Sequence, residues 1–183
     1  MSPLAVSSAE LVDIDDRKQL RRAFGAFATG VTVVTVGGDD CRGMTANSFT
    51  AVSLTPPLLL ICVDKDAFMH RSLSHSETFS ISVLSADQEA VARHFADHSR
   101  PAGPDQFRTV DWVPGPATGT PMIAGSLAHF ECAKEELYDG GDHTIFVGRV
   151  LAADRMPSIE DPLLFHGGQF RHLHSRSAEG RVA

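Results

Sequence analysis

The segment from Met44 to Ser53 combines hydroxyl, amide and small side chains in a way that suits ligand binding. It reads MTANSFTAVS, where a plain core strand would carry larger apolar groups. Small residues let a backbone approach a flat ligand closely, and hydroxyl and amide groups can hydrogen-bond the edge of a heterocycle. These residues alone leave two alternatives open, a ligand site and a polar strand that faces solvent.

Two histidine pairs have a spacing at which a metal ion can bind. His94 and His98 are four residues apart on an expected helix, and His172 and His174 are two apart on an expected strand. Neither pair has an acidic or cysteine ligand at a recognised spacing. We therefore expect no metal site and interpret these histidines as surface or supporting residues.

Common catalytic and nucleotide-binding motifs are missing from the sequence. It has no G-x-G-x-x-G after a strand, no G-x-x-x-x-G-K-[ST], no H-E-x-x-H and no G-x-S-x-G. Rossmann, P-loop, zincin and α/β-hydrolase interpretations therefore lose their main support. A hydrolase that uses Ser48 or Ser126 with a histidine would also lack a nucleophile elbow, which argues against it.

Length and composition predict one soluble domain. The chain has 183 residues, of which 43% are hydrophobic, and this is enough material for a single core. Its net charge of -7 argues against non-specific binding to nucleic acid or anionic membrane. No run reaches the roughly 18 apolar residues of a membrane span, and the first residues do not resemble a signal peptide. Cys41, Cys62 and Cys132 are widely spaced in apolar runs, so we expect reduced thiols and a cytoplasmic protein.

The elements that must position these residues are mostly strands. We predict strands at 31–36, 42–47, 58–63, 79–84, 126–136, 144–154 and 163–173, and helices at 15–27, 68–75 and 87–96. The segment 97–120 is rich in Pro, Gly and Asp and is expected to cross the surface with Trp112 as its anchor. Strands that follow one another through hairpins predict a closed antiparallel barrel with a few helices. We expect the domain at 15–174, between flexible segments at 1–14 and 175–183.

Six runs, taken in order, resemble the flavin reductase family of two-component flavin-dependent monooxygenases. They are RAFGAFATGVTVVT (22–35), GMTANSFTAVSLTPPLLLICV (43–63), FSISVL (79–84), HFA (94–96), GDHTIFVGRV (141–150) and PLLFHGGQF (162–170). The resemblance covers about Arg17 to Leu173. It implies a fold that is mostly β with a few helices, the FMN-binding split β-barrel with Greek-key topology.

The resemblance also implies a set of site residues. It assigns the isoalloxazine ring and ribityl chain to Thr32, Val33, Thr45, Ala46, Asn47 and Ser48. It assigns the flavin phosphate to Cys62, Lys65 and Ser72, where Lys65 supplies a point charge and Ser72 is expected near the start of a short helix whose free N–H groups favour an anion. It places Phe95 and Ala96 at the outer part of the flavin, and His143 of the GDHT run beside the nicotinamide. Gln169-Phe170 departs from the Tyr or His found in some relatives, which leaves Phe170 only a role in shaping the nicotinamide pocket.

The implied activity is that of an NAD(P)H:flavin oxidoreductase. Such an enzyme reduces FMN or FAD by hydride transfer and supplies the reduced flavin to a separate monooxygenase. NADH is preferred to NADPH because no Arg-rich segment indicates a 2'-phosphate pocket. The flavin carries the difficult chemistry, so His143 is expected to orient the nicotinamide carboxamide without donating a proton. The family's site lies at a two-fold interface, which implies a homodimer.

Two alternatives within the same fold stay open. In the first, the flavin remains bound as a prosthetic group, and the protein carries electrons or reduces another acceptor. In the second, the protein is a binding module that holds FMN without accelerating NADH oxidation.

Overall fold

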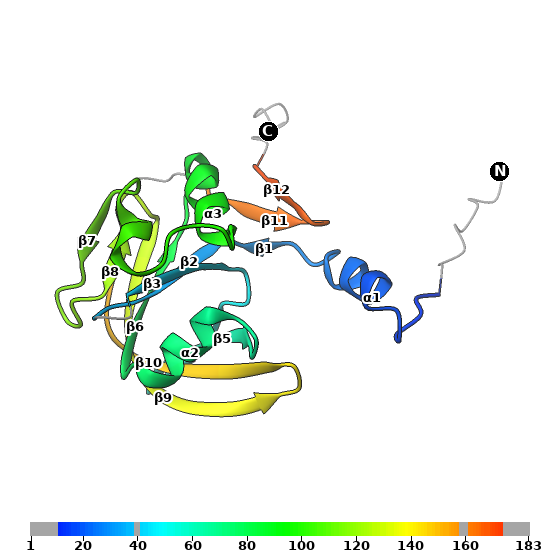
Figure 1. Ribbon diagram of the computed structural model, residues 1–183, viewed down its shortest axis with the longest axis horizontal. Helices are drawn as coiled ribbons and strands as arrows, with labels where there is room; N and C mark the ends of the chain where they lie inside the picture. Colours follow the sequence, from blue (N-terminus) through cyan, green and yellow to red (C-terminus); the bar gives the residue numbers. More distant parts are fainter. Residues whose placement is uncertain (1–10, 39–40, 158–160, 174–183) are drawn as a thin grey trace, which may run out of the picture.

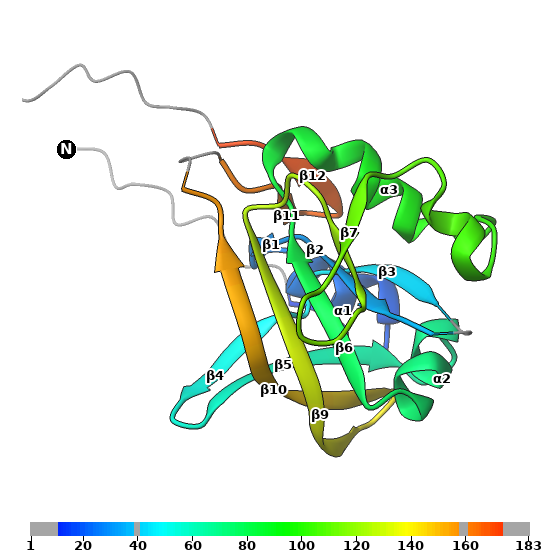
Figure 2. The ribbon, with the colours of Figure 1, turned by 90° about the vertical axis from the view of Figure 1, so that its left-hand side faces the viewer.

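A seven-stranded antiparallel sheet forms the centre of the protein. The computed structural model describes residues 11–38, 41–157 and 161–173. In spatial order, the strands of this sheet are β3 (Arg42–Ala46), β2 (Thr32–Val36), β6 (Thr78–Val83), β9 (Ala128–Gly140), β10 (His143–Arg155), β5 (Pro57–Asp64) and β4 (Thr50–Leu54). The sheet curls without closing, and β3 and β4 are its two free edges (Figure 2). The predicted split barrel is confirmed, whereas the closed barrel expected from the strand pattern alone is wrong.

The first hairpin of the sheet follows directly from the sequence. The run VTVVTV is β-branched throughout, and β2 pairs with β3 from Thr32 opposite Ala46 to Val36 opposite Arg42. Strand β4 is not among the predicted strands. Four of its five residues are exposed, so β4 has no buried apolar face that an alternating pattern could reveal.

Two helices and a short turn lie against the β3 edge (Figure 1). Helix α2 (Phe68–His75) has the predicted bounds, and helix α3 (Glu89–Ala96) follows a 3-10 turn, η1 (Ala86–Gln88). A second 3-10 turn, η2 (Gly103–Phe107), also contacts β3. None of the helices within the described ranges is long and apolar enough to cross a membrane.

The long segment 97–120 is anchored differently from the prediction. Trp112 begins β7 (Trp112–Pro114), which pairs with β8 (Pro121–Ile123), and its side chain is 43% exposed. The buried large side chains of the segment are those of Gln106 and Phe107. The prediction of Trp112 as the anchor is therefore wrong, because the chain turns inward five residues earlier.

The end of the described chain is a small hairpin in place of the single strand predicted for 163–173. Strand β11 (Leu164–His166) pairs with β12 (Gln169–Arg171) and with β1 (Thr29–Gly30). Gly167 and Gly168 have φ of 60° and 78°, a left-handed conformation that lets the chain reverse there. Of the chain ends predicted to be flexible, only residues 11–14 lie within the described ranges.

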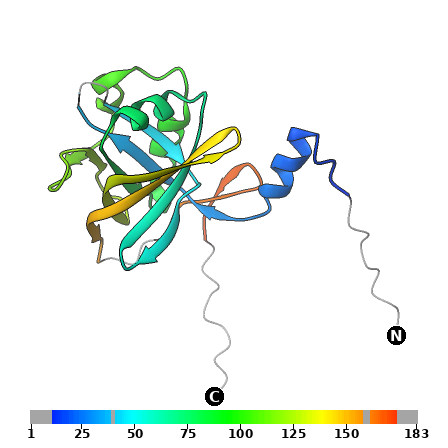
Figure 3. The same ribbon diagram turned by 90° about the horizontal axis from the view of Figure 1, so that it is seen from below.

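Helix α1 (Arg17–Phe24) projects away from the rest of the protein (Figures 1 and 3). It begins at Asp16, whose carboxylate accepts hydrogen bonds from the backbone N–H groups of Lys18 and Gln19. None of its residues is buried, and Phe24 and Phe27 are 71% and 78% exposed. The helix predicted for 15–27 is present but shorter, and the described part of the chain buries none of its side chains.

The buried side chains form two clusters. The first fills the interior of the curled sheet and includes Ile61, Phe79 and Phe146. The second lies beside α3 and includes Val33 and Phe95. Val34 of β2 belongs to the first cluster and Val33 to the second, so both faces of this strand are packed.

Candidate active site

His143 stands at the tip of the β9–β10 hairpin. It is the first residue of β10 and lies opposite Gly140 of β9 and Asp64 of β5. The turn contains Gly141, whose φ of 78° is a conformation that glycine adopts without steric cost. The His143 side chain is 41% exposed, so the imidazole ring is accessible at the end of the sheet.

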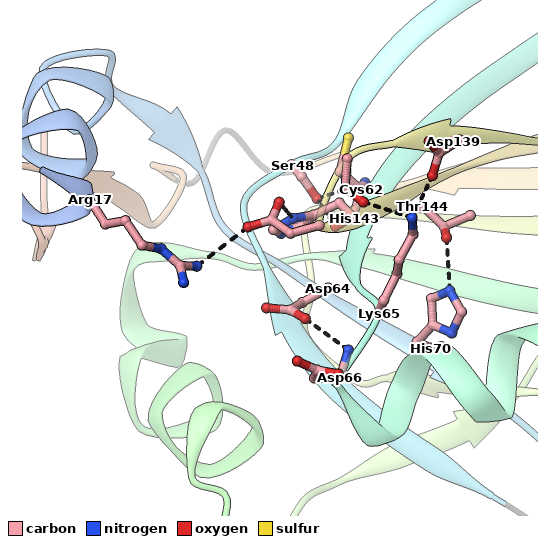
Figure 4. Close-up of polar contacts among 12 residues, drawn as sticks. Arg17, Ser48, Cys62, Asp64, Lys65, Asp66, His70, Asp139, His143 and Thr144 are labelled. Atoms are coloured by element: carbon pink, nitrogen blue, oxygen red, sulfur yellow. Dashed lines mark hydrogen bonds and ion pairs between the residues drawn. The ribbon is translucent and has the colours of Figure 1, made fainter. Parts of the chain in front are cut away.

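Asp142 orients this ring. Its Oδ1 lies 2.7 Å from Nδ1 of His143, and its Oδ2 lies 3.4 Å from Nη2 of Arg17 in α1. The hydrogen bond with His143 holds the pKa of the Asp142 carboxyl below its ordinary value, and the charge of Arg17 also lowers it. Because a carboxylate only accepts, Nδ1 carries a hydrogen, and a neutral ring then presents Nε2 as an acceptor. Within the described ranges Nε2 has no partner, so it can bind a ligand (Figure 4).

Lys65 fastens the hairpin tip to the connection between β5 and α2. Its Nζ pairs with the Asp139 carboxylate and donates to the backbone oxygen of Gly141 at 2.6 Å (Figure 4). Its backbone N–H donates to the backbone oxygen of Asp142 at 3.0 Å. The ammonium charge predicted to meet a phosphate is thus already matched by a carboxylate. Lys65 supports the position of His143.

Ser48 joins the TANSF segment to β5. Its hydroxyl accepts the N–H of Cys62 at 3.0 Å and donates to the carbonyl of Cys62 at 2.9 Å. Cys62 lies opposite Ile145, two residues along β10 from His143, so the Cys62 and His143 side chains share one face of the sheet. Because the Ser48 hydrogen is used, this hydroxyl can bond a ligand only as an acceptor. Burial raises the pKa of the Cys62 thiol, which keeps the thiol neutral.

A cavity of about 530 Å³ lies between β3, the β5–α2 connection and the end of α3. This volume is typical of small-molecule sites. Three of the residues predicted to contact flavin line it, namely Thr45, Phe95 and Ala96. Asp64 also lines it and is the β5 neighbour of His143, so the cavity and the hairpin tip adjoin.

Several other predicted contacts are buried in the strands. Thr32 donates its hydroxyl to the backbone oxygen of Ala46 at 2.8 Å, and both residues are at most 9% exposed. Val33 is fully buried in the second core cluster. Asn47, by contrast, is exposed and donates from Nδ2 to Thr29 Oγ1 at 3.2 Å. The flavin contacts assigned to these residues stay predictions.

Ser72 and Phe170 occupy places that the prediction did not anticipate. Ser72 is the fifth of eight residues in α2, so the argument from free N–H groups at the helix start does not apply to it. It is 3% exposed and accepts a hydrogen bond from Nε of Arg42 at 3.2 Å. The Phe170 ring packs edge-on against Phe165 and lies under the guanidinium of Arg93, 4.9 Å from ring centroid to carbon.

Sequence reasoning assigned no role to four residues of this region. Asp142 could have been found, because it precedes His143 and a carboxylate next to an imidazole often orients it. Arg17, Arg42 and Arg100 carry no signal in the sequence, because each one reaches the site through the tertiary fold.

One histidine of each pair considered for metal binding has another partner. Nε2 of His94 bonds the backbone oxygen of Gln106 at 2.7 Å, and Nε2 of His172 bonds Glu89 at 3.3 Å. His174 lies outside the described residues. No group of three or more metal-ligating side chains occurs in the part of the chain that the structure describes.

Comparison with known proteins identifies the family of this chain. The model of the flavin reductase like domain matches residues 24–174. The chain belongs to the flavin reductase-like family. An NADH-dependent FAD reductase of Streptomyces globisporus is 63% identical to this flavin reductase-like protein over 183 residues, which is 100% of both chains.

Solved structures of other flavin reductases share the fold of this flavin reductase-like protein. The S. globisporus NADH:FAD oxidoreductase SgcE6, in complex with NAD and FAD fragments, has a TM-score of 0.87 and 62% identity, over 92% of this chain and 99% of that one. BorF, the flavin reductase component of a bacterial two-component tryptophan halogenase, has a TM-score of 0.83 and 55% identity, over 88% and 100%.

Proposed function

We propose that this protein uses NADH to reduce FAD or FMN and releases the reduced flavin to a separate flavin-dependent monooxygenase. The names of its relatives support this function, since one is an NADH-dependent FAD reductase and another serves a halogenase. A flavin, when bound, accepts the hydride that NADH donates, so the demanding chemistry belongs to the two nucleotides. The protein must hold the flavin and the nicotinamide next to each other in the orientation that hydride transfer requires.

The residues present fit a flavin nucleotide. The cavity beside β3 combines the apolar side chains of Met44 and Phe95 with the guanidinium groups of Arg42 and Arg100. Apolar walls suit a ring system, and guanidinium groups suit phosphate oxygens.

The hairpin tip is suited to orienting the nicotinamide. With Nδ1 donating to Asp142, a neutral His143 presents Nε2 as an acceptor for the carboxamide N–H₂ of NADH. Lys65 keeps the tip against the β5–α2 connection, which limits movement of the imidazole. We therefore assign His143 a positioning role, with Asp142 and Lys65 acting through it.

One observation carries the proposal: the accessible imidazole of His143 adjoins a cavity of about 530 Å³ across the ladder between β5 and β10. The test is the rate of NADH oxidation by purified protein, followed by absorbance, with and without added FAD or FMN. We expect rapid oxidation that depends on free flavin. Protein that purifies with tightly bound flavin and oxidises NADH without addition would favour the prosthetic-group alternative. No oxidation with either flavin would refute both.

We further propose that the protein is a homodimer. The projecting helix α1 has no buried residue, and Phe24 at its end and Phe27 just beyond it are largely exposed. On β4, Leu54 is 93% exposed and Val52 49%. A second copy of the chain would remove these apolar surfaces from water, a favourable change of roughly 25 cal/mol per Å². Sedimentation equilibrium tests this, and a monomer at micromolar concentration would contradict it.

A further inference from the structure

The cavity beside β3 contains two arginines that form no ion pair with a carboxylate among the described residues. Arg42 begins β3, and Arg100 lies in the segment that follows α3. Across the described ranges, no ion pair involves either guanidinium. Burial lowers the pKa of Arg100, and the charge of Arg42 lowers it further. The two cations therefore repel each other in a partly desolvated place, which an anion would relieve.

Arg42 is held by neutral groups that leave its outer face available. Its Nε donates to Oγ of Ser72 at 3.2 Å, and its guanidinium carbon lies 5.3 Å from the centroid of the Phe68 ring. Ser72 is almost fully buried in α2, so this support is fixed. Neither terminal amino group of Arg42 has a partner in the described part of the chain. They are the pair of donors that binds two oxygens of a phosphate.

Arg100 is held by backbone oxygens. Its Nη1 donates to the carbonyl of Asp97 at 2.6 Å, and its Nη2 donates to the carbonyl of Gly43. Gln106, which is fully buried, lies 3.5 Å from Arg100 Nε through its Oε1. These contacts fix the direction of the guanidinium without neutralising its charge, so the site is formed before a ligand arrives.

Two carboxylates also line the cavity, and they restrict where an anion can bind. Asp64 and Asp66 belong to the connection between β5 and α2, and Oδ1 of Asp64 accepts the backbone N–H of Asp66 at 2.8 Å. Neither is within ion-pair distance of Arg42 or Arg100. An anion is therefore favoured only at the arginine side.

We propose that Arg42 and Arg100 together bind a phosphate group of the flavin nucleotide. This inference rests on the proposed function and deepens it. It names phosphorylated flavins as the substrates, and riboflavin, which has no phosphate, should bind less tightly. It also moves the phosphate contact away from Lys65, whose charge is matched by Asp139. Thr45 and Phe95, both predicted to contact flavin, line the same cavity as the two arginines.

The experiment compares riboflavin, FMN and FAD as ligands of Arg42→Met, Arg42→Lys and the unmodified protein. Dissociation constants come from flavin fluorescence, and KM for NADH is measured at saturating FAD. We expect Arg42→Met to weaken FMN and FAD binding by on the order of tenfold or more, with riboflavin unchanged, because charged hydrogen bonds to phosphate are lost. The FMN and FAD affinities of Arg42→Lys should lie between those of Arg42→Met and the unmodified protein. Lysine keeps the positive charge but cannot form the two parallel hydrogen bonds of a guanidinium group. Arg71→Met, on the exposed face of α2, is the matched control for loss of one positive charge.

Each outcome decides the proposal. Equal weakening of riboflavin and FMN, or no change in either, would overturn it. A rise in KM for NADH alone would also overturn it, because the arginines would then bind the pyrophosphate of the nicotinamide nucleotide, which has the same chemistry. Thermal melting identifies a variant that is unfolded, and Arg42→Lys then replaces it in the comparison. Flavin binding is measured without turnover, so failure of the unmodified protein to oxidise NADH would refute the proposed function separately.

Discussion

Replacing Gly43 with alanine should destabilise the protein, because the strand and α3 approach too closely at this point. A Cβ atom on Gly43 would lie 2.4 Å from Cε1 and 2.6 Å from Cδ1 of Phe95. The Phe95 ring is fully buried and packs against Phe107, with ring centroids 5.3 Å apart, so it has little room to move. Overpacking of this kind costs about 1–3 kcal/mol. Alanine also lowers the conformational entropy of the unfolded chain, which stabilises the folded protein by roughly 0.4–1 kcal/mol, so the net loss is about 0–2.6 kcal/mol.

The matched control is Gly30→Ala, since a Cβ at Gly30 in β1 meets nothing within 4 Å. Urea unfolding, monitored by circular dichroism, gives the free energy of unfolding of each variant. A double variant, Gly43→Ala with Phe95→Leu, should recover part of the loss, because the smaller side chain makes room for the methyl group. We expect a favourable coupling of about 0.5–3 kcal/mol. If Gly43→Ala is as stable as Gly30→Ala, or if the two changes are additive, the close contact does not control the packing of α3.

Three further predictions follow from the site and the core. His143→Ala should raise KM for NADH by roughly 2- to 12-fold, the loss of one hydrogen bond, and leave KM for flavin nearly unchanged in steady-state assays; an unchanged KM for NADH would remove the role given to this residue. Glu131→Gln should lower the free energy of unfolding in urea by about 2–3 kcal/mol, because the buried carboxylate accepts the N–H of Ala117 and both the N–H and the hydroxyl of Thr118. A loss no larger than that of the exposed control Glu136→Gln would contradict this prediction. Burial raises the pKa of the Cys132 thiol from 9.0 to about 12, so the free energy of unfolding should fall as pH rises through this window, while the unfolded thiol ionises and the folded one does not. The difference between the unmodified protein and Cys132→Ala should shift by about 1.4 kcal/mol per pH unit there, and a constant difference would refute the assignment.

Local patterns in the sequence predicted the elements whose residues contact one another within a short stretch. The hairpin of β2 and β3 and the bounds of α2 belong to this group, because a continuous β-branched run and turn residues decide them locally. Strand β4 was missed because it is exposed on both faces. The strand predicted for 163–173 was wrong because Gly167 and Gly168 reverse the chain inside it.

The site was predictable only where a single motif held both the functional residue and its support. The run GDHT places Asp142 beside His143, and the resemblance to flavin reductases predicted a role for that histidine, which stays a prediction. The partners of Lys65 lie more than seventy residues away in the chain, so no local pattern indicates that its charge is already matched. The same is true of Arg42 and Arg100, which come together only because α2 and α3 both pack against β3.

The two free edges of the sheet differ in how their backbone groups are protected. At β3, the N–H of Gly43 donates to Oε1 of Gln106 at 2.8 Å and its carbonyl accepts from Arg100, so side chains occupy positions that an incoming strand would need. Strand β4 instead presents the exposed apolar side chains of Val52 and Leu54 along its edge. In a single chain, side chains therefore protect the backbone groups of the β3 edge, whereas the β4 edge stays open to pairing with another strand. On the proposal that the protein is a homodimer, aggregation should start at β4 when the two copies separate, and storage at a concentration that keeps them paired should preserve solubility.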